Sequence, residues 1–371
     1  MTQNQPRLAT LDDIPALVEL ELECFNCDQL TKRSFRYFIT KAQAQLWVVG
    51  HPVAAYGLVL FHRGTSLARI YSLAVSVHAR GKGYGRTLME VVEKASAEQG
   101  ALFVRLEVAD DNTGAIALYE SLKYQPIRRL HQYYEDGHDG IRMEKRLLRN
   151  LHKPAQVPHF AQTTDFTCGP AALMMALKHL NPAAPMTQIE ELNLWREATT
   201  IFMTRGHGGT SPLGLALSAK QRGYHVQVWL SSREAPFIAS VRGVEKKHII
   251  ELIHQDFMRR AEAQGMPLKV FPNRLEPIRA AITAGFAIIL LISTYRFNRS
   301  KEPHWVWLVH MDNDYAYIND PDVDKEQWQS ELDNVYVPVP LADFEMMIKY
   351  GRQAYRSAIL VSREEREIFP T

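Results

Sequence analysis

The sequence lacks the features that mark several classes of protein. Its 371 residues include only three cysteines, Cys24, Cys27 and Cys168, too few for the disulfide framework of a small secreted domain. No run approaches the roughly 18 apolar residues of a membrane helix, and the opening residues lack the basic and then apolar pattern of a signal peptide. We therefore expect a cytoplasmic protein that does not insert into a membrane.

The sequence also lacks an excess of either charge. The 43 lysines and arginines are balanced by 41 aspartates and glutamates, which leaves a formal net charge of +2. Proteins dedicated to nucleic acids carry a strong basic excess, so we expect no nucleic-acid partner. At roughly 150 residues per domain, the length predicts two domains.

The chain divides near residue 150, where a stretch with Pro154 and Pro158 shows no apolar periodicity. Before it, strand-like runs alternate with amphipathic helical patterns at 14–25, 85–98 and 113–122. After it, helical patterns at 169–180 and 242–264 precede strand-like runs at 287–292, 305–309 and 315–318. We expect an α/β (α+β) fold in two domains, residues 6–148 and 157–365, joined by a linker over residues 149–156.

A basic, glycine-rich loop stands between a predicted strand and a predicted helix. It reads Arg80-Gly81-Lys82-Gly83-Tyr84-Gly85-Arg86. Glycines allow successive backbone N–H groups to converge at a helix N-terminus, where the helix dipole also favours anions. Such a nest suits a pyrophosphate, and Arg80, Lys82 and Arg86 would add charge-assisted contacts. The spacing differs from the P-loop and from the dinucleotide fingerprint, so the loop alone is also compatible with a simple basic turn.

Together with Leu73, Ala74 and Val75 in the preceding strand, this loop resembles the coenzyme motif of the GNAT family of acetyl-CoA-dependent N-acetyltransferases. Within that family, residues 6–147 are most similar to the ribosomal-protein-alanine N-acetyltransferases. The residues that carry this likeness are Leu106-Glu107-Val108, Asn112, 115–122, Arg128-Arg129 and Tyr133-Tyr134. The resemblance implies a GNAT fold with a mixed central sheet flanked by helices, acetyl-CoA as cosubstrate, and a protein or peptide as acceptor.

The resemblance also implies roles for single residues. The loop would hold the coenzyme A pyrophosphate, and the backbone of 73–75 would contact the pantetheine arm. Glu107 is the candidate base, acting through a water, and Tyr119 the candidate acid for the coenzyme A thiolate. Asn112 would fix either the pantetheine or the entry to the next helix. Without the resemblance, Glu107 could equally be a solvated strand end and Tyr119 a core aromatic.

The pKa of the acceptor favours a protein N-terminus. An α-amino group has a pKa of about 7.7–8.0, against about 10.4 for a lysine. It is therefore partly neutral near neutral pH, as acetyl transfer requires, and we expect the α-amine to be the acceptor.

Two features of this first half need separate treatment. The family usually has Gly-Phe where this chain has Lys123-Tyr124, and we expect the missing glycine to change the turn after the helix and the shape of the acceptor pocket. Cys24 and Cys27 form a Cys-x-x-Cys without a second pair for zinc. We expect both to be buried or half-buried thiols, and we expect no metal.

The second half contains a set of residues suited to nucleophilic catalysis. Cys168 directly precedes Gly169-Pro170 and a predicted helix, whose dipole lowers the pKa of a thiol at its N-terminus. Gln162 lies six positions earlier and could supply an oxyanion donor. His304 opens one predicted strand and Asp320 follows the next, so a hairpin would place Asp320 where it orients the imidazole.

These four residues resemble those of the papain-like double-glycine leader peptidases that process bacteriocin precursors. The likeness is at the level of motifs over about residues 156–323. The stretch 233–266 and the part from Tyr336 onward have no counterpart in it. The resemblance implies a papain-like cysteine peptidase fold with catalytic Gln162, Cys168, His304 and Asp320.

The sequence therefore predicts an N-acetyltransferase fused to a cysteine peptidase that processes a peptide. The alternative is a single-activity acetyltransferase whose second domain binds a peptide without cutting it.

Overall fold

The computed structural model describes residues 5–26, 28–62, 64–147, 157–199, 209–238, 241, 243–295, 300, 302–323 and 331–366. The chain forms two compact units, Met1–Lys153 and Pro154–Thr371. The predicted linker over 149–156 lies outside the described residues. None of the helices in the described ranges is long and apolar enough to cross a membrane.

The first unit is built on a seven-stranded sheet in the order β1-β2-β3-β4-β5-β7-β6. β4 and β5 are parallel and the other neighbours antiparallel, so the sheet is mixed. Its elements are β1 (Arg7–Leu8), α1 (Ile14–Cys24), α2 (Lys32–Thr40), β2 (Ala44–Val49), β3 (Ala55–Phe61), β4 (Leu67–Val75), α3 (Tyr84–Glu98), β5 (Phe103–Ala109), α4 (Thr113–Ser121), β6 (Gln125–Leu130) and β7 (Gly140–Arg146).

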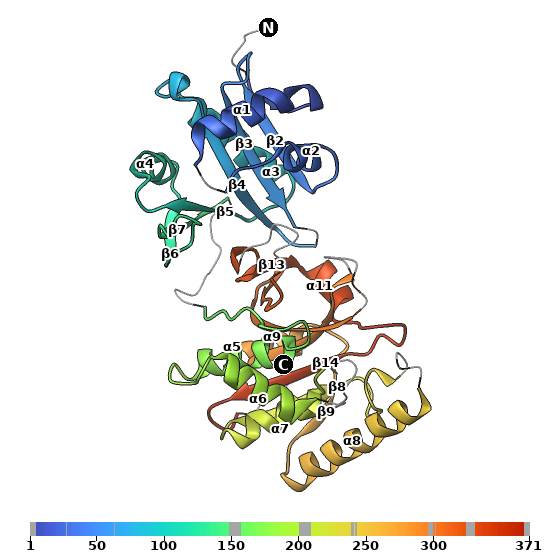
Figure 1. Cartoon of the computed structure of the whole chain (residues 1–371). Helices are drawn as coiled ribbons and strands as arrows, with labels where there is room; N and C mark the ends of the chain where they lie inside the picture. Colours follow the sequence, from blue (N-terminus) through green and yellow to red (C-terminus); the bar gives the residue numbers. More distant parts are fainter. Residues whose placement is uncertain are drawn as a thin grey trace. The chain divides into compact units, whose positions relative to one another are not determined.

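Helices cover both faces of this sheet. Figure 1 shows α1 and α2 in front of the sheet and α3 behind it. Alternate residues of β5 explain this layering: Val104, Leu106 and Val108 share a core with α3 and α4, whereas Arg105 and Glu107 point to the opposite face. The helices predicted at 14–25, 85–98 and 113–122 agree with α1, α3 and α4 to within one residue at each end.

The second unit is built on another seven-stranded sheet, in the order β13-β12-β11-β10-β14-β8-β9. Its elements are α5 (Cys168–Leu180), α6 (Gln188–Ala198), α7 (Pro212–Gln221), β8 (His225–Leu230), α8 (Val244–Ala263), β9 (Leu268–Val270), α9 (Glu276–Thr283), β10 (Ala287–Ser293), β11 (Pro303–Met311), β12 (Tyr315–Asn319), β13 (Val337–Pro340), α11 (Leu341–Met347) and β14 (Ser357–Ser362).

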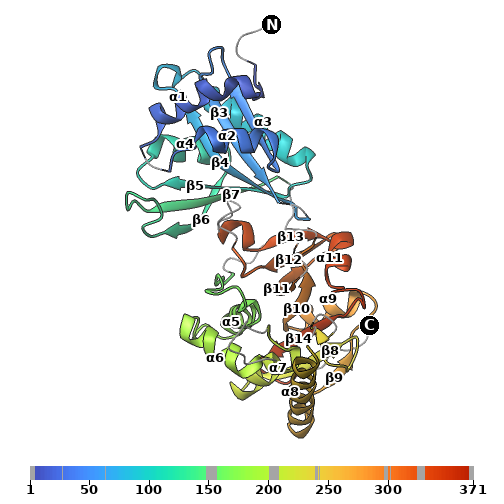
Figure 2. The ribbon, with the colours of Figure 1, turned by 45° about the vertical axis from the view of Figure 1, so that its right-hand side comes forward.

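This second sheet is also buried on both faces. Trp305 and Trp307 of β11 pack into a core shared with α5, α6 and α7. The alternating Val306 and Leu308 pack into a second core on the other face, with α9 and α11. Figure 2 shows α5–α7 on one side of the sheet and α9 and α11 on the other.

The part of the chain after Tyr336 is integral to this unit. β14 comes last in the chain but lies in the sheet between β10 and β8, and it pairs with both. The resemblance to leader peptidases did not extend to this region, because the motifs that carry it lie on α5, β11 and the loop after β12. The predicted helix at 242–264 is α8.

Candidate functional site

The first candidate site lies where β4 and β5 separate. The two strands pair only at Leu67↔Phe103, Ala68↔Val104 and Arg69↔Arg105. Beyond these pairs, β4 continues to Val75 along β3, and β5 continues to Ala109 along β7. The backbone edges of Leu73, Ala74 and Val75 therefore face away from β3 without a partner strand, as the contact with a pantetheine arm requires.

The glycine loop leads from this edge into α3. Gly81 and Gly83 have φ values of +77° and +82°, which L-residues with side chains rarely adopt. A Cβ on either glycine would meet nothing within 4 Å, so the backbone there is open. α3 begins at Tyr84, directly after the N-cap Gly83, and the amides of its first turn have no partner within the helix. Arg80 and Lys82 are exposed beside them, so the loop fits a pyrophosphate.

The other predicted coenzyme contacts have structural partners. Gly85 lets α3 approach α4, because a Cβ there would lie 3.2 Å from Leu118 Cδ2. Arg86 Nη2 donates to Ser121 Oγ on α4 at 2.7 Å. Asn112 is the N-cap of α4, where its side chain accepts from the amide of Ala115 at 3.1 Å. Of the two roles expected for Asn112, the geometry shows the helix entry.

Glu107 lies on β5 in the part that has separated from β4. Its side chain is only 5% exposed, so it is not a solvated strand end. Arg69 of β4 donates to Glu107 Oε2 at 2.9 and 3.0 Å, and Arg142 Nε of β7 lies 3.6 Å from Oε1. Two guanidinium groups on neighbouring strands thus fix this carboxylate. Arg69 and Arg142 were not singled out from the sequence, although Arg69 is the one charged residue of β4 and charges alternate with apolar residues along β7.

Tyr119 lies in the core beneath α4. It is 6% exposed, and burial raises its pKa to about 12, so the hydroxyl keeps its proton at neutral pH. Its ring centroid is 5.9 Å from that of Tyr124.

The turn after α4 contains a lysine in an unusual backbone conformation. Lys123 adopts φ +73°, the left-handed conformation that glycine favours after a helix. The amides of Lys123 and Tyr124 close the helix by donating to the carbonyls of Glu120 and Tyr119. Tyr124, which is fully buried, anchors the chain directly after this lysine. The effect of the missing glycine on the acceptor pocket stays a prediction.

Tyr133 and Tyr134 approach this site from the turn between β6 and β7. Burial and the neighbouring Glu107 carboxylate raise the pKa of Tyr133, which places its hydroxyl beside the candidate base. The ring centroids of Tyr133 and Tyr134 are 5.1 Å apart, and the rings are arranged edge to face.

Of the two cysteines in the Cys-x-x-Cys, the structure describes the first. The half-buried Cys24 donates to the carbonyl of Val75 at 3.4 Å, and burial raises its pKa. Cys27 lies outside the described residues. In the described part of the chain, no three His, Cys, Asp or Glu side chains are arranged to hold a metal ion.

The second candidate site lies at one end of the β11–β12 hairpin. The register Trp307↔Asn319 brings His304 and Asp320 to the same end. His304 Nε2 and Asp320 Oδ1 are 2.6 Å apart, with side chains 9% and 13% exposed. Cys168 lies close enough to His304 to influence its protonation. Burial acts to lower the pKa of His304, but Asp320 and Cys168 outweigh it and hold that pKa well above its ordinary value.

Cys168 is the first residue of α5, at the positive end of the helix dipole. The glycine after it is required by packing. A Cβ on Gly169 would lie 2.1 Å from Thr210 Oγ1 and 2.9 Å from Leu215 Cδ1. Gly169 thus allows α5 to pack against the start of α7 with the thiol at its tip.

Gln162 is attached to the residues that follow Asp320. Its backbone N–H donates to the carbonyl of Pro321 at 2.8 Å, and its Nε2 lies 3.4 Å from Asp322 Oδ1. His159 Nε2 bonds the carbonyl of Asp320 at 2.8 Å. The chain before Cys168 is therefore attached to the turn that carries Asp320.

Glu191 fixes the loop between Gln162 and Cys168. This fully buried carboxylate on α6 accepts from the amide of Thr163 at 2.9 Å and from the hydroxyls of Thr163 and Thr167 at 2.5 Å each. Both the loop and the start of α5 depend on these bonds. No local sequence signal marks Glu191, since its partners lie more than twenty residues earlier.

Comparisons with known proteins match each unit to a family. Residues 157–362 match the Peptidase_C39-like family, and residues 14–124 match the acetyltransferase (GNAT) family. The chain is 31% identical to N-alpha-acetyltransferase MAK3 of Arabidopsis thaliana over 134 residues, which cover 35% of this chain and 70% of that protein. It is 30% identical to N-alpha-acetyltransferase 30 of Schizosaccharomyces pombe over 137 residues, covering 36% and 89% respectively.

Solved structures also align with the chain. The ribosomal-protein-S18-alanine N-acetyltransferase of Escherichia coli is 23% identical, with a TM-score of 0.36, and the alignment covers 41% of this chain and 98% of that one. Ard1 of Thermoplasma volcanium is 24% identical, with a TM-score of 0.37, and covers 40% and 100%.

Fold and family together define a fusion of an acetyltransferase-type domain with a cysteine-peptidase-like domain. The chain belongs to the GNAT acetyltransferase family through its first unit. Through its second unit, it belongs to the Peptidase_C39-like family.

The raised pKa of His304 predicts a pH-dependent contribution to stability. The folded state favours protonated His304, so this stability is fully present below the ordinary pKa of about 6.5 and is lost as pH rises through the raised pKa of the folded state. Asp320→Asn should lower the free energy of unfolding by about 3 kcal/mol near pH 6 and by less at alkaline pH. Urea unfolding at a series of pH values measures this, with the exposed Asp314→Asn as control. A difference that stays constant with pH would show that Asp320 does not charge His304.

Proposed function

We propose that the first unit is an acetyl-CoA-dependent N-acetyltransferase that acts on the α-amine of a protein or peptide. The observation that carries this proposal is the position of Glu107, a buried and doubly paired carboxylate at the point where β4 and β5 separate. The similar proteins named as N-alpha-acetyltransferases support the choice of an α-amine.

Each residue then has a definite task. The exposed amides and cations of residues 80–86 hold the pyrophosphate, and the free edge of 73–75 binds the pantetheine arm. Acetyl-CoA supplies the acetyl group as a thioester. As the C–N bond forms and the C–S bond breaks, Glu107 takes the amine proton through a water. Tyr119, whose raised pKa keeps its hydroxyl protonated, returns a proton to the sulfur.

Glu107→Gln tests the base. General-base catalysis contributes about 10²–10⁴-fold, so acetylation of an N-terminal peptide by the full chain should fall by that factor in kcat, as followed by coenzyme A release. The matched control is Glu144→Gln, which removes a buried carboxylate paired with Arg105 at 2.8 Å on the same face of the sheet. Equal losses in both variants would mean that Glu107 supports the fold rather than the chemistry.

We further propose that the second unit is a cysteine hydrolase that cleaves a peptide. It is supported by the His304–Asp320 contact and by the effect of Cys168 on the pKa of His304. Cys168 is the nucleophile, and His304 accepts its proton and later gives it to the leaving amine. Asp320 orients the imidazole and keeps it protonated. The first amides of α5 donate to the developing oxyanion, and the Gln162 amide joins them once it leaves Asp322. In the competing proposal, the same unit holds a peptide without cutting it.

Alkylation of the thiol separates these two proposals. With limiting iodoacetamide between pH 5 and 9, Cys168 should be labelled below the ordinary thiol pKa of about 8.5 and at least tenfold faster than Cys24, as located by peptide mass spectrometry. His304→Ala should abolish this advantage, because the neutralising imidazolium is lost. His179→Ala, on the same helix as Cys168, should retain it. Labelling of Cys168 no faster than Cys24 would favour the peptide-holding module.

A further inference from the structure

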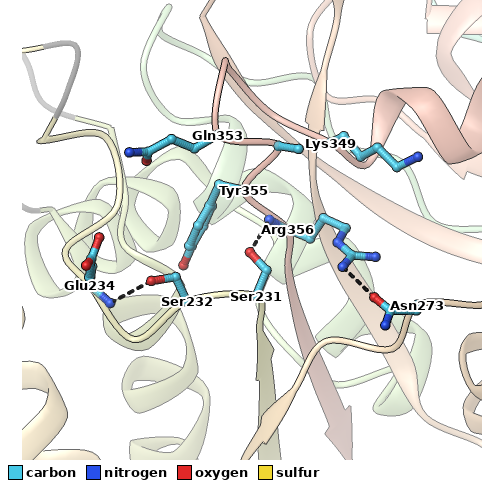
Figure 3. A pocket seen from close by; sticks show the side chains of 9 residues that line it. Ser231, Ser232, Glu234, Asn273, Lys349, Gln353, Tyr355 and Arg356 are labelled. Carbon is cyan, nitrogen blue, oxygen red and sulfur yellow. Dashed lines mark hydrogen bonds between the residues drawn. The ribbon is translucent and has the colours of Figure 1, made fainter.

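A polar pocket lies in the second unit at the end of β8 and β14. Its volume of about 560 Å³ falls within the roughly 300–1,000 Å³ typical of ligand sites. It is formed by the residues after β8, the residues before β14, the segment that follows α11 and the loop before α9. Figure 3 shows Lys349, Tyr355, Arg356 and Glu234 around it.

The strand register places this pocket at the same end of the sheet as His304. His304 pairs with Ile292 across β11 and β10, and the β10–β14 register, extended by two residues, brings Arg356 opposite Ile292. Arg356 is joined to Ser231 by two hydrogen bonds, of 2.8 and 3.0 Å. Since neighbouring strands are about 4.8 Å apart, Arg356 lies about 10 Å from His304 in the direction across the strands, which an extended peptide spans with about three residues.

The lining is rich in hydrogen-bond donors and carries a net positive charge. The lining contains two cations, Lys349 and Arg356, and one carboxylate, Glu234. Its remaining polar groups are hydroxyls and amides. Among the described residues, neither cation forms an ion pair. Arg356 is held in place by neutral partners: Nη1 donates to the carbonyl of Pro272 at 3.1 Å, and Nη2 donates to Asn273 Oδ1 at 2.9 Å. Figure 3 shows the second of these bonds at the edge of the pocket.

The guanidinium is therefore positioned before any ligand arrives. It also lies over the ring of Phe271, 5.2 Å from its centroid. An arginine fixed by neutral partners retains its full charge and loses little side-chain entropy when it binds an anion. A carboxylate is the anion that peptides supply.

We propose that this pocket is a subsite of the hydrolase and takes the acidic side chain of a peptide substrate, an Asp or Glu about three residues from the bond that is cut. The proposal rests on the hydrolase function above and adds the substrate class. Lys349 and Arg356 bind the carboxylate, and Tyr355, Asn273 and the two serines after β8 surround it.

Cleavage specificity tests the subsite. The full chain is incubated with a proteome-derived peptide library, and the new termini are identified by mass spectrometry. We expect Asp or Glu to be enriched at one position two to four residues from the cut. Lys349→Glu and Arg356→Gln should each reduce cleavage of these peptides about tenfold and remove the enrichment. Lys246→Glu, an exposed lysine on α8 outside the pocket, should not. Cleavage without acidic enrichment in the wild type would overturn the subsite and leave the hydrolase intact.

A binding measurement keeps the two proposals distinguishable if no peptide is cut. The Cys168→Ala full chain is titrated with fluorescein-labelled triglutamate and, as the neutral probe, triglutamine. Binding of triglutamate at least tenfold tighter, lost in Lys349→Glu, would support the anion pocket even if the hydrolase proposal failed. Equal affinity for both probes would overturn the pocket.

Discussion

The second unit depends on the charged contact between His304 and Asp320, two groups that are both largely out of water. A buried imidazolium is unfavourable unless a carboxylate offsets its lost hydration. Here, the carboxylate is fixed from several directions. Asp320 Oδ1 also accepts from the amide of Asp322 at 2.9 Å, and the amide of Asp320 donates to the carbonyl of Asn334 at 2.8 Å. The segment before Cys168 is attached to the same turn. The position of the nucleophile and the position of the charge pair are thus set by one set of contacts.

The first unit also contains a buried cluster of paired charges, which lies on the face of a sheet rather than at the end of a hairpin. Arg69, Glu107 and Arg142 come from three adjacent strands, and their side chains are 7%, 5% and 4% exposed. Their mutual pairing makes burial tolerable, and it holds the Glu107 carboxylate where the strands separate. In the first unit, two arginines therefore orient the carboxylate that we assign to proton transfer, and in the second a carboxylate orients the histidine.

Sequence reasoning reached the elements more fully than the contacts between them. Amphipathic periodicity located α1, α3, α4 and α8, whereas α5 was located from Pro170 in its first turn and is buried on all sides over residues 169–177. Chain order placed His304 and Asp320 on a hairpin, since antiparallel neighbours with a short connection bring such positions together. Sequence reasoning missed Glu191 and the pairing of Arg69 with Glu107, because those contacts join residues between 24 and 38 positions apart. It did not predict the left-handed backbone of Lys123, which stands directly before the buried Tyr124. The central place of β14 could not be read from its sequence, because an apolar run does not state which strands it will pair with.

The place of β14 has a consequence for synthesis on the ribosome. The first unit has its seven strands by Arg146, and contacts within it can form while the rest of the chain is still being made. The second sheet is different. Until residues 357–362 emerge, β10 and β8 have no strand between them. The end of the sheet that runs from His304 on β11 to Ser231 after β8 is then incomplete. The polar pocket therefore joins the end of the sheet that carries His304 only once β14 has been synthesised.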